Sequence, residues 1–179
     1  MRVGEKKILR PVVERVGAGD AGRTRQCAAL MAASEPWLTL RVAIAALLGV
    51  VRDAAKEVHA VVENGRVVAC IVLDMRGPFA GYIQAVCVHP GQRGRGLGTA
   101  LVRWAEKRVF RETPNVFLCV SSFNKGAQRF YRRLGYQTVG RLRDFIVAEH
   151  DEVLLRKTIG PRRGFRKKKD PAKLDRRLS

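Results

Sequence analysis

The stretch Val86-Cys87-Val88-His89-Pro90-Gly91-Gln92-Arg93-Gly94-Arg95-Gly96-Leu97-Gly98-Thr99 decides the fold. It begins as an apolar, β-branched run, stops at a proline, passes through a loop of glycine and arginine, and opens a helix. An apolar stripe at helical spacing predicts that helix, and its members are Leu97, Leu101, Trp104, Ala105 and Val109. A strand that leads directly into such a helix is typical of α/β proteins.

The loop between this strand and helix has the chemistry of an anion-binding site. The first N–H groups of a helix lack intrahelical partners, and the helix dipole places partial positive charge there. Gly94, Gly96 and Gly98 let the backbone approach a ligand closely, and Arg93 and Arg95 add formal charge. These features favour a phosphate or pyrophosphate, although an ordinary loop with solvated arginines has the same composition.

Spacing distinguishes three kinds of phosphate-binding loop. The P-loop motif requires lysine where this chain has Leu97, and the dinucleotide-binding fingerprint requires glycine where it has Thr99. The pattern that fits is Arg93-x-x-Gly96-x-Gly98, which follows a strand ending at His89-Pro90. Here the sequence resembles the GNAT acetyltransferase superfamily, whose loop for the pyrophosphate of acetyl-CoA reads Arg/Gln-x-x-Gly-x-Gly/Ala.

A second motif strengthens this resemblance. Asn124-x-x-Ala127-x-x-Phe130-Tyr131-x-x-Leu134-Gly135-Tyr136 is similar to the second signature of the same superfamily. Because both motifs occur in the expected order, the chain is identified as a GNAT member of the single-domain, bacterial or archaeal type. The resemblance covers roughly residues 5–160 and does not extend to the basic end of the chain.

The resemblance implies an α/β fold, with a central mixed, twisted sheet of six to seven strands and about four flanking helices. Local patterns predict strands at 8–16, 58–63, 66–76, 82–88, 116–120, 136–139, 145–147 and 153–157. They predict helices at 21–33, 40–53, 97–109 and 125–134. We expect one transferase domain over residues 1–160 and a basic, disordered tail over residues 161–179.

The resemblance also implies acetyl-CoA as co-substrate and assigns the residues that hold it. In the family, the loop amides bind the pyrophosphate, the fourth strand pairs with the pantetheine amides, and the motif asparagine bonds to the same arm. The cofactor-binding residues carried over to this chain are Val86, Cys87, Val88, Arg93, Gly94, Arg95, Gly96, Leu97, Gly98, Thr99, Asn124 and Tyr131. Tyr131 is also the expected catalytic acid for the departing thiolate, with a packed aromatic ring as the alternative.

Spacing does not identify the general base. In the ribosomal-protein alanine acetyltransferases of this family a glutamate stands five residues before the motif asparagine, where this chain has Cys119. A buried cysteine behaves as a small apolar residue unless its pKa is lowered, so we do not assign it as the base. Glu149, His150, Gln84 or Tyr82, acting through a water, remain candidates.

The net charge of +19 indicates anionic partners and disfavours polycationic acceptors. We therefore expect transfer to an amine of a peptide or protein, with Trp37 and Leu38 either lining the acceptor site or packing in the core. The alternative function is a catalytically weak binding module that contacts RNA or the ribosome through its basic surface and tail. Nine Lys and Arg against two Asp give residues 160–179 a net charge of +7 for such contacts.

The cysteines and apolar runs indicate the compartment. Cys27, Cys70, Cys87 and Cys119 form no C-x-x-C pair and the three histidines are scattered, so we expect reduced thiols and no metal site. The longest apolar run is too short to span a bilayer, and we expect no signal peptide and no membrane contact. The prediction is a cytoplasmic protein, with monomer and homodimer both open.

Overall fold

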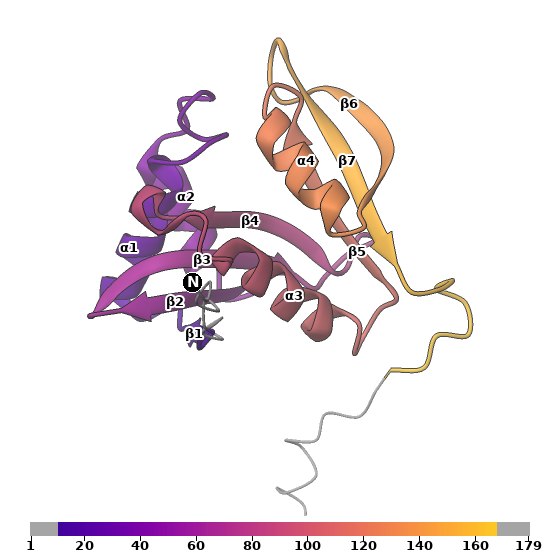
Figure 1. The fold of residues 1–179 in the computed structure, drawn as a ribbon, viewed down its shortest axis with the longest axis horizontal. Coiled ribbons are helices and arrows are strands. Elements are labelled where there is room, and N and C mark those ends of the chain that lie inside the picture. The colour runs from indigo at the N-terminus through magenta and orange to yellow at the C-terminus, as the bar shows by residue number, and fades with distance from the viewer. Residues whose placement is uncertain (1–10, 168–179) are drawn as a thin grey trace, which may run out of the picture.

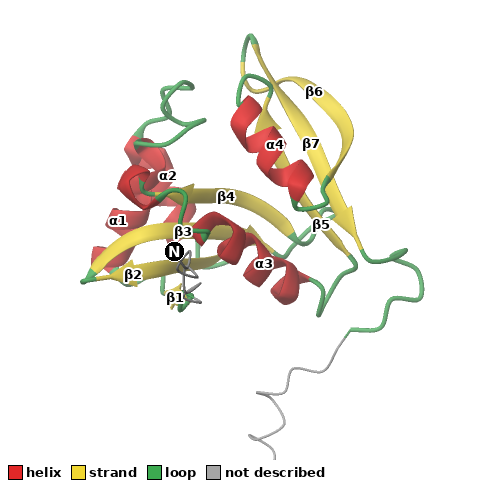
Figure 2. Ribbon diagram, in the orientation of Figure 1, coloured by secondary structure: helices red, strands yellow, loops and turns green. Residues whose placement is uncertain are grey.

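The computed structural model describes residues 11–167. Within them, a mixed seven-stranded sheet has the order β1-β2-β3-β4-β5-β7-β6, with helices on both faces (Figures 1 and 2). The strands are β1 (Glu14–Val16), β2 (Glu57–Glu63), β3 (Arg66–Asp74), β4 (Tyr82–Val88), β5 (Asn115–Ser121), β6 (Gln137–Val147) and β7 (His150–Thr158). The helices are α1 (Ala21–Ala32), α2 (Ile44–Arg52), α3 (Leu97–Val109) and α4 (Lys125–Arg133), with a short 3-10 turn at Pro90–Gln92. The predicted α/β architecture is confirmed.

Two hydrophobic clusters hold the helices to opposite faces of the sheet. On one face α1 and α2 pack against the strands, with Met31 and Val72 fully buried between them. On the other face α3 packs through Leu101 against a layer that includes Ile71 and Leu118. Ile71 and Val72 are neighbours on β3 and face opposite clusters, as alternation along a strand requires. The apolar runs of the sequence therefore become a sheet buried on both sides.

The junction of β4 and β5 positions the site. These strands are parallel, whereas every other neighbouring pair among the described strands is antiparallel. They pair only at Tyr82–Phe117 and Ile83–Leu118, and beyond that point they diverge (Figure 1). β4 stays paired with β3 to its end, at Ala69–Val88. The opposite edge of β4, from Gln84 to Val88, thus has no strand partner within residues 11–167.

Two short sequence signals, a helix cap and a hairpin turn, are confirmed by the structure. The side chain of Asp20 accepts a hydrogen bond from the Arg23 N–H at 2.9 Å and caps α1 as predicted. Asn64 and Gly65 take φ values of 51° and 74°, which is the conformation of the expected type I′ turn between β2 and β3.

Three predicted elements differ in extent. The strand expected at 8–16 is confined to Glu14–Val16 among the described residues, and Pro11, which has no N–H, lies outside it. The helix expected at 40–53 begins at Ile44, because Arg41 takes a left-handed φ of 51° and the chain turns there. The segments 136–139 and 145–147 belong largely to one long strand, β6, which pairs with β7.

The tail expected over residues 161–179 lies outside the described residues from residue 168 on. Its first part leaves β7 near the start of β5, and Phe165 lines a cavity of about 270 Å³ together with Met75 and Pro114. Within residues 11–167, no helix is both long and apolar enough to cross a lipid bilayer.

Candidate active site

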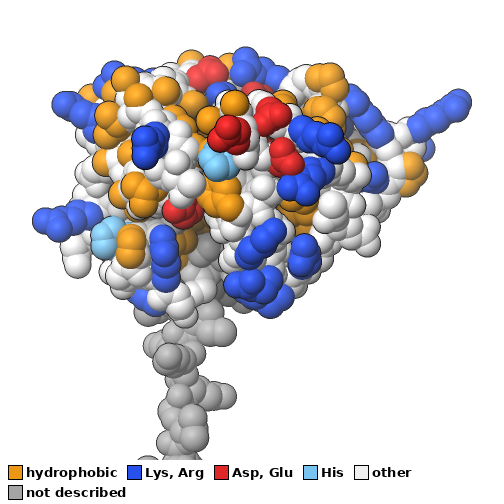
Figure 3. Space-filling view, turned by 90° about the horizontal axis from the view of Figure 1, so that it is seen from above, with side chains coloured by type: hydrophobic (Ala, Val, Ile, Leu, Met, Phe, Trp, Pro, Cys, Tyr) orange, Lys and Arg blue, Asp and Glu red, His pale blue; other side chains and the backbone are white. Residues whose placement is uncertain are grey.

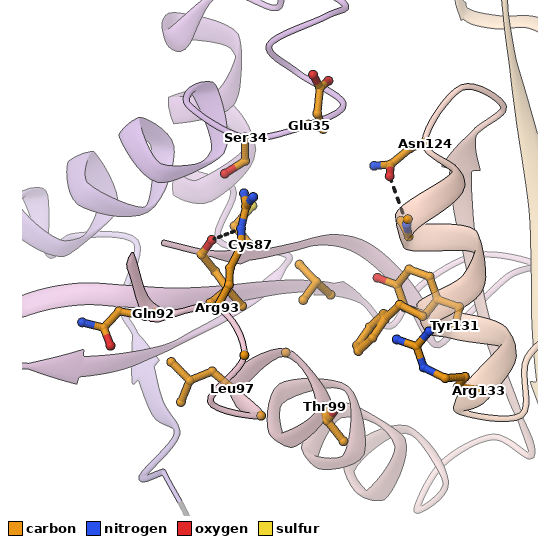
Figure 4. Close-up of a pocket in the computed structure, with 18 residues that line it drawn as sticks. Ser34, Glu35, Cys87, Gln92, Arg93, Leu97, Thr99, Asn124, Tyr131 and Arg133 are labelled. Carbon is orange, nitrogen blue, oxygen red and sulfur yellow. Dashed lines mark hydrogen bonds between the residues drawn. The ribbon is translucent and has the colours of Figure 1, made fainter. Parts of the chain in front are cut away.

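A cavity of about 590 Å³ lies between the end of β4, the first turn of α3 and one side of α4 (Figure 4). All predicted cofactor-binding residues line it except Arg95. Further lining residues that were not among the predicted cofactor-binding residues are Ser34, Glu35, Gln92, Gly126, Ala127, Phe130 and Arg133, of which Ala127 and Phe130 belong to the second motif. We call this space the loop cavity. The fold thus brings the two sequence motifs, which lie on α3 and α4, to opposite walls of one cavity.

The glycine loop leaves the first turn of α3 without a capping side chain. Gly94 and Gly96 take φ values of 77° and 81°, in the left-handed region that glycine tolerates, and Gly96 is the N-cap of α3. A Cβ placed on Gly96 would meet no atom within 4 Å. The N–H groups that open the helix therefore face accessible space with no side chain bonded to the cap, which suits a phosphate group.

The two loop arginines take different positions. Arg93 lines the cavity, and its Nε donates to the carbonyl oxygen of Val88 at 3.4 Å. Arg95 instead donates two hydrogen bonds to Glu63 of β2, at 2.9 and 3.0 Å, and a further one to Gln92. The side chain of Arg95 therefore fixes the loop to the β2–β3 hairpin, whereas that of Arg93 remains beside the loop cavity.

The free edge of β4 presents backbone groups to the loop cavity. The N–H of His89 donates to the carbonyl oxygen of Val68 in β3, at 2.8 Å. Because backbone groups alternate between the two sides of a strand, those of Cys87 point toward β3 and those of Val86 and Val88 toward the gap. An extended ligand in this gap would find the N–H and C=O groups that a further strand would otherwise use.

Asn124 and Tyr131 reach the same space from α4. Asn124 is the N-cap of α4, and its Oδ1 accepts the Ala127 N–H at 3.0 Å, so its side-chain N–H groups stay available as donors. Tyr131 is 8% exposed and packs edge-on against Phe130 and Tyr136. Its hydroxyl points across the cavity toward β4 (Figure 4). Burial raises the pKa of Tyr131, which keeps the hydroxyl protonated at neutral pH.

A second cavity, of about 480 Å³, opens on the other side of Tyr131. The segment before α2, α2 itself, β4, β5 and the β6–β7 hairpin form its walls. It shares Glu35, Val86, Asn124, Ala127 and Tyr131 with the loop cavity. We call it the acceptor cavity, because a molecule held there would meet the contents of the loop cavity at Tyr131.

The candidate bases and acceptor residues divide between this cavity and the surface. Tyr82, Gln84 and Trp37 line the acceptor cavity, whereas Glu149 and His150 are not among its lining residues. Leu38 is 59% exposed and does not line it either.

Cys119 and Tyr82 both remain protonated at neutral pH. Burial is the main cause that raises the pKa of each of these two groups. Neither side chain is therefore poised to act as a base.

Sequence reasoning missed both acidic residues at this cavity, Glu35 and Glu152, of which Glu152 is the buried one. Glu152 on β7 is 2% exposed, and its Oε1 accepts a hydrogen bond from Ser121 Oγ at 2.5 Å. Burial raises the pKa of Glu152 above the usual range of a glutamate. The register of β5 against β7 pairs Ser121 with Glu152, and this contact between distant segments leaves no motif in the sequence. The only local signal was a carboxylate opening the apolar run Val153-Leu154-Leu155.

Comparison with known proteins places this site in a family. The sequence pattern of the acetyltransferase (GNAT) family matches residues 25–136. A mycothiol acetyltransferase from Mycobacterium sp. (strain JLS) is 35% identical over 78 residues, which are 41% of this chain and 26% of that enzyme. The chain thus aligns with about a quarter of that enzyme's length.

Solved structures share the whole fold at low identity. A protein described as an acetyltransferase of the GNAT family from Desulfovibrio desulfuricans superposes with a TM-score of 0.70 at 15% identity, covering 83% of this chain and 99% of that one. An aminoglycoside 6′-N-acetyltransferase complexed with coenzyme A gives a TM-score of 0.68 at 18% identity, with coverages of 84% and 98%. Since the family pattern spans more than half of the sequence, from within α1 to just beyond α4, this chain belongs to the GNAT acetyltransferase family.

Proposed function

We propose that this protein is an acetyl-CoA-dependent N-acetyltransferase that moves the acetyl group to an amine of a peptide or protein. The observation that carries the proposal is the meeting of the two cavities at Tyr131, Asn124 and Val86. One cavity has an anion-binding helix end and a free strand edge, and the other approaches the same point from the opposite side. This arrangement suits transfer of a group from one bound molecule to another.

The residues of the loop cavity fit acetyl-CoA. The uncapped first turn of α3 and Arg93 would hold the pyrophosphate. The pantetheine arm carries amides that match the backbone groups of Val86 and the N–H of Val88, which have no strand partner, and the Asn124 side chain has N–H groups to donate to the same arm. With those anchors in place, the thioester would lie near Tyr131.

The transfer step needs an electrophile, a proton donor and a route for the amine. The nitrogen of the acceptor attacks the thioester carbonyl from the acceptor cavity, a C–N bond forms and the C–S bond breaks. Backbone N–H groups at the free edge of β4 would stabilise the developing oxyanion. Tyr131, whose raised pKa keeps it protonated, would donate its hydrogen bond and then its proton to the leaving sulfur.

Binding of acetyl-CoA to a Gly96→Glu variant tests the proposal. The side chain would enter the open space at the end of α3 with a negative charge, at a φ of 81° that glutamate tolerates poorly. We expect calorimetry to detect acetyl-CoA binding by the wild-type chain and none by Gly96→Glu.

Gly77→Glu is the matched control for that test. Gly77 has a similar φ of 72° and equally open surroundings, and it lies between β3 and β4, outside both cavities. The control should therefore carry a similar backbone strain and still bind acetyl-CoA. Equal affinities for acetyl-CoA in wild type and a folded Gly96→Glu protein would contradict the assignment of the loop cavity.

A further inference from the structure

The acceptor cavity has an unusual composition for so basic a chain. The sequence contains 35 Lys and Arg, but none of those within residues 11–167 lines this cavity. Most of the wall is apolar, and its larger side chains are Trp37, Leu40, Val42, Leu47, Val50, Ile83, Val86, Phe145 and Ile146. The charged lining residues are Glu35 and Glu152. A cavity that combines apolar walls with carboxylates and excludes cations complements a cationic guest with an apolar body.

The distribution of ion pairs leads to the same conclusion. Within residues 11–167, nine acidic side chains form salt bridges with Arg or Lys: Glu14, Asp20, Asp53, Glu57, Glu63, Asp74, Glu106, Glu112 and Asp151. The acids that form none in that range are Glu35, Asp144, Glu149 and Glu152. Glu35 and Glu152 line the acceptor cavity. Asp144 precedes the lining residues Phe145 and Ile146 on β6, and Glu149 lies in the turn after that strand and donates its N–H to Asp144. Acids left without a cationic partner thus gather at one end of the molecule.

The surface at this end has the same character. Phe145 and Ile146 line the cavity and are still 58% and 54% exposed, so they form an apolar rim. The space-filling view from above shows acidic side chains near the middle of this face, with hydrophobic side chains and also Lys and Arg side chains beside them (Figure 3). An acceptor would therefore cross an apolar rim at Phe145 and Ile146 before it reaches the interior.

Glu152 is the only charged group deep in this cavity among the described residues. Glu35 is exposed at the rim, and both of its carboxylate oxygens already accept bonds from Thr39. Glu152 is 2% exposed, with Ser121 Oγ bonded to one oxygen. The ionisable groups that bear on Glu152 are Tyr82 from β4, Cys119 from β5 and His150 from its own strand. One carboxylate oxygen is held in place by Ser121, and no hydrogen bond within residues 11–167 engages the other.

We propose that the acceptor is a primary amine carried on an apolar body, and that Glu152 binds its ammonium group and takes its proton before attack. The inference rests on the proposed function and names the substrate class of that site. The proton balance is complete: the ammonium gives one proton to Glu152, and the neutral nitrogen then attacks the thioester carbonyl. The proton lost from nitrogen after attack passes to solvent, and Tyr131 supplies the one that the leaving sulfur takes up. Tyr131 then regains a proton from solvent and Glu152 releases its proton to solvent, so each cycle releases one proton in all.

The apolar walls of the acceptor cavity restrict the acceptor to amines that carry a single positive charge. A single buried carboxylate neutralises a single ammonium, whereas each further cation of a polyamine would face apolar side chains and lose hydration. An apolar body of the size of a Leu or Phe side chain would gain about 10- to 100-fold in kcat/KM over an acceptor that lacks it, from burial alone. The rim at Phe145 and Ile146 is open, so the body can be a free small molecule or the first residue of a peptide.

An acceptor panel with the full chain and acetyl-CoA tests the substrate class. Phenylalaninamide, leucinamide and glycinamide share an α-amine and differ in the apolar body, and kanamycin adds further cations. Release of free thiol gives the rate, and a Phe-Ala-Ala peptide amide separates a peptide source from a small-molecule source. We expect phenylalaninamide or its peptide to exceed glycinamide by about 10- to 100-fold, with kanamycin lowest.

A Glu152→Gln variant tests the role of the carboxylate. The amide has the same shape and can still accept the bond from Ser121, so the fold and acetyl-CoA affinity should persist. We expect kcat/KM for phenylalaninamide to fall about 10²- to 10⁴-fold at pH 7, the range for loss of a positioned base. The deficit should shrink as pH rises above the pKa of the acceptor amine, near 8 for an α-amine, because a neutral amine needs no base. Glu112→Gln, at an exposed pair with Arg108, is the matched control and should keep wild-type rates.

Each outcome of these experiments is decisive. Preference for glycinamide or kanamycin, or no acetylation of any panel member by a chain that binds acetyl-CoA, overturns the substrate class. A Glu152→Gln deficit that is absent or constant across pH overturns the role of Glu152. Failure of the wild-type chain to bind acetyl-CoA in calorimetry overturns the proposed function itself, and the separate binding assay distinguishes that result from the others.

Discussion

The Tyr131 hydroxyl stands at the point where both cavities meet, and among residues 11–167 no hydrogen bond to it is formed. Its ring is fixed by edge-on contacts with Phe130 and Tyr136, at centroid distances of 5.0 and 5.5 Å. A hydroxyl that is held in place at a cavity wall and has no protein acceptor is suited to donate to a ligand atom. The same residue would be hard to explain as a packed aromatic ring alone, since phenylalanine would fill that space without an unused polar group.

Tyr131→Phe separates these two roles. The change removes one oxygen and keeps the ring, so acetyl-CoA affinity and melting temperature should stay close to wild type. We expect kcat to fall about 10²- to 10⁴-fold with KM little changed, because the hydroxyl acts chiefly on the leaving sulfur in the transition state. Steady-state kinetics with an acceptor from the panel measures this. Tyr136→Phe, next to Tyr131 but outside both cavities, is the control, and full activity in Tyr131→Phe would assign the ring to packing only.

At the scale of elements, one lysine joins three of them on the side of α4. Lys157 of β7 donates to Glu106 of α3 at 2.9 Å and to the carbonyl oxygen of Leu134, the C-cap of α4, at 2.8 Å. Glu106 is 5% exposed and also accepts a bond from Arg103 at 2.8 Å. Lys157 thus satisfies a buried carboxylate and a helix-end carbonyl at the same time.

Lys157→Met should destabilise the fold without changing the lining of either cavity. The variant keeps the length of the side chain and loses both bonds, while Arg103 still neutralises part of the Glu106 charge. We expect the free energy of unfolding to fall by about 1–3 kcal/mol, the usual range for bonds to charged groups. Thermal unfolding should register a decrease of about 2–4 °C per kcal/mol. Lys107→Met, on the exposed side of α3, should change stability by less than about 0.5 kcal/mol; a similar loss in both variants would rule out the specific role of Lys157.

The two cavities differ in how well their residues could be predicted from the sequence. The loop cavity was predictable, because its ligand-facing residues are consecutive in two motifs and each motif opens a helix. Its twelve predicted residues all line it except Arg95, whose partner Glu63 is contributed by a different hairpin. The acceptor cavity was not predictable in the same way. Glu152 lies at this cavity because of the register between β5 and β7. Trp37 lies there in the segment before α2, which begins only after the chain turns at Arg41.

At the scale of the whole molecule, charge is distributed unequally. The chain is strongly basic, yet the acids of residues 11–167 that form no ion pair lie in or near the acceptor cavity, so the two kinds of surface suit different partners. Polyanions would bind the basic surface and the tail, while the acceptor cavity would take the cationic acceptor that we propose. We retain the hypothesis that the tail over residues 161–179 contacts RNA, separately from catalysis.

Truncation tests this separation. A chain that ends at Lys167 keeps Phe165 beside Met75 and Pro114, and removes five Lys and Arg from residues 168–179. We expect it to fold and to bind acetyl-CoA like the full chain. The slope of log K against log salt for single-stranded RNA should become less steep by about 0.7 for each RNA phosphate that the shortened chain no longer neutralises. An unchanged slope would remove the tail from RNA binding, and loss of acetyl-CoA affinity would show that the two regions are coupled.

The short pairing of β4 with β5 has a consequence for the mechanics of the molecule. Two residue pairs are all that link these strands, so the half that carries β1–β4 and the half that carries β5–β7 share few backbone bonds across the sheet. A pantetheine arm lying along Val86 and Val88 would act as a removable extra strand between them. Arrival of the co-substrate would then stiffen the whole sheet, and its departure as free thiol would loosen it again. Rigidity in such an enzyme would rise and fall once in every turnover.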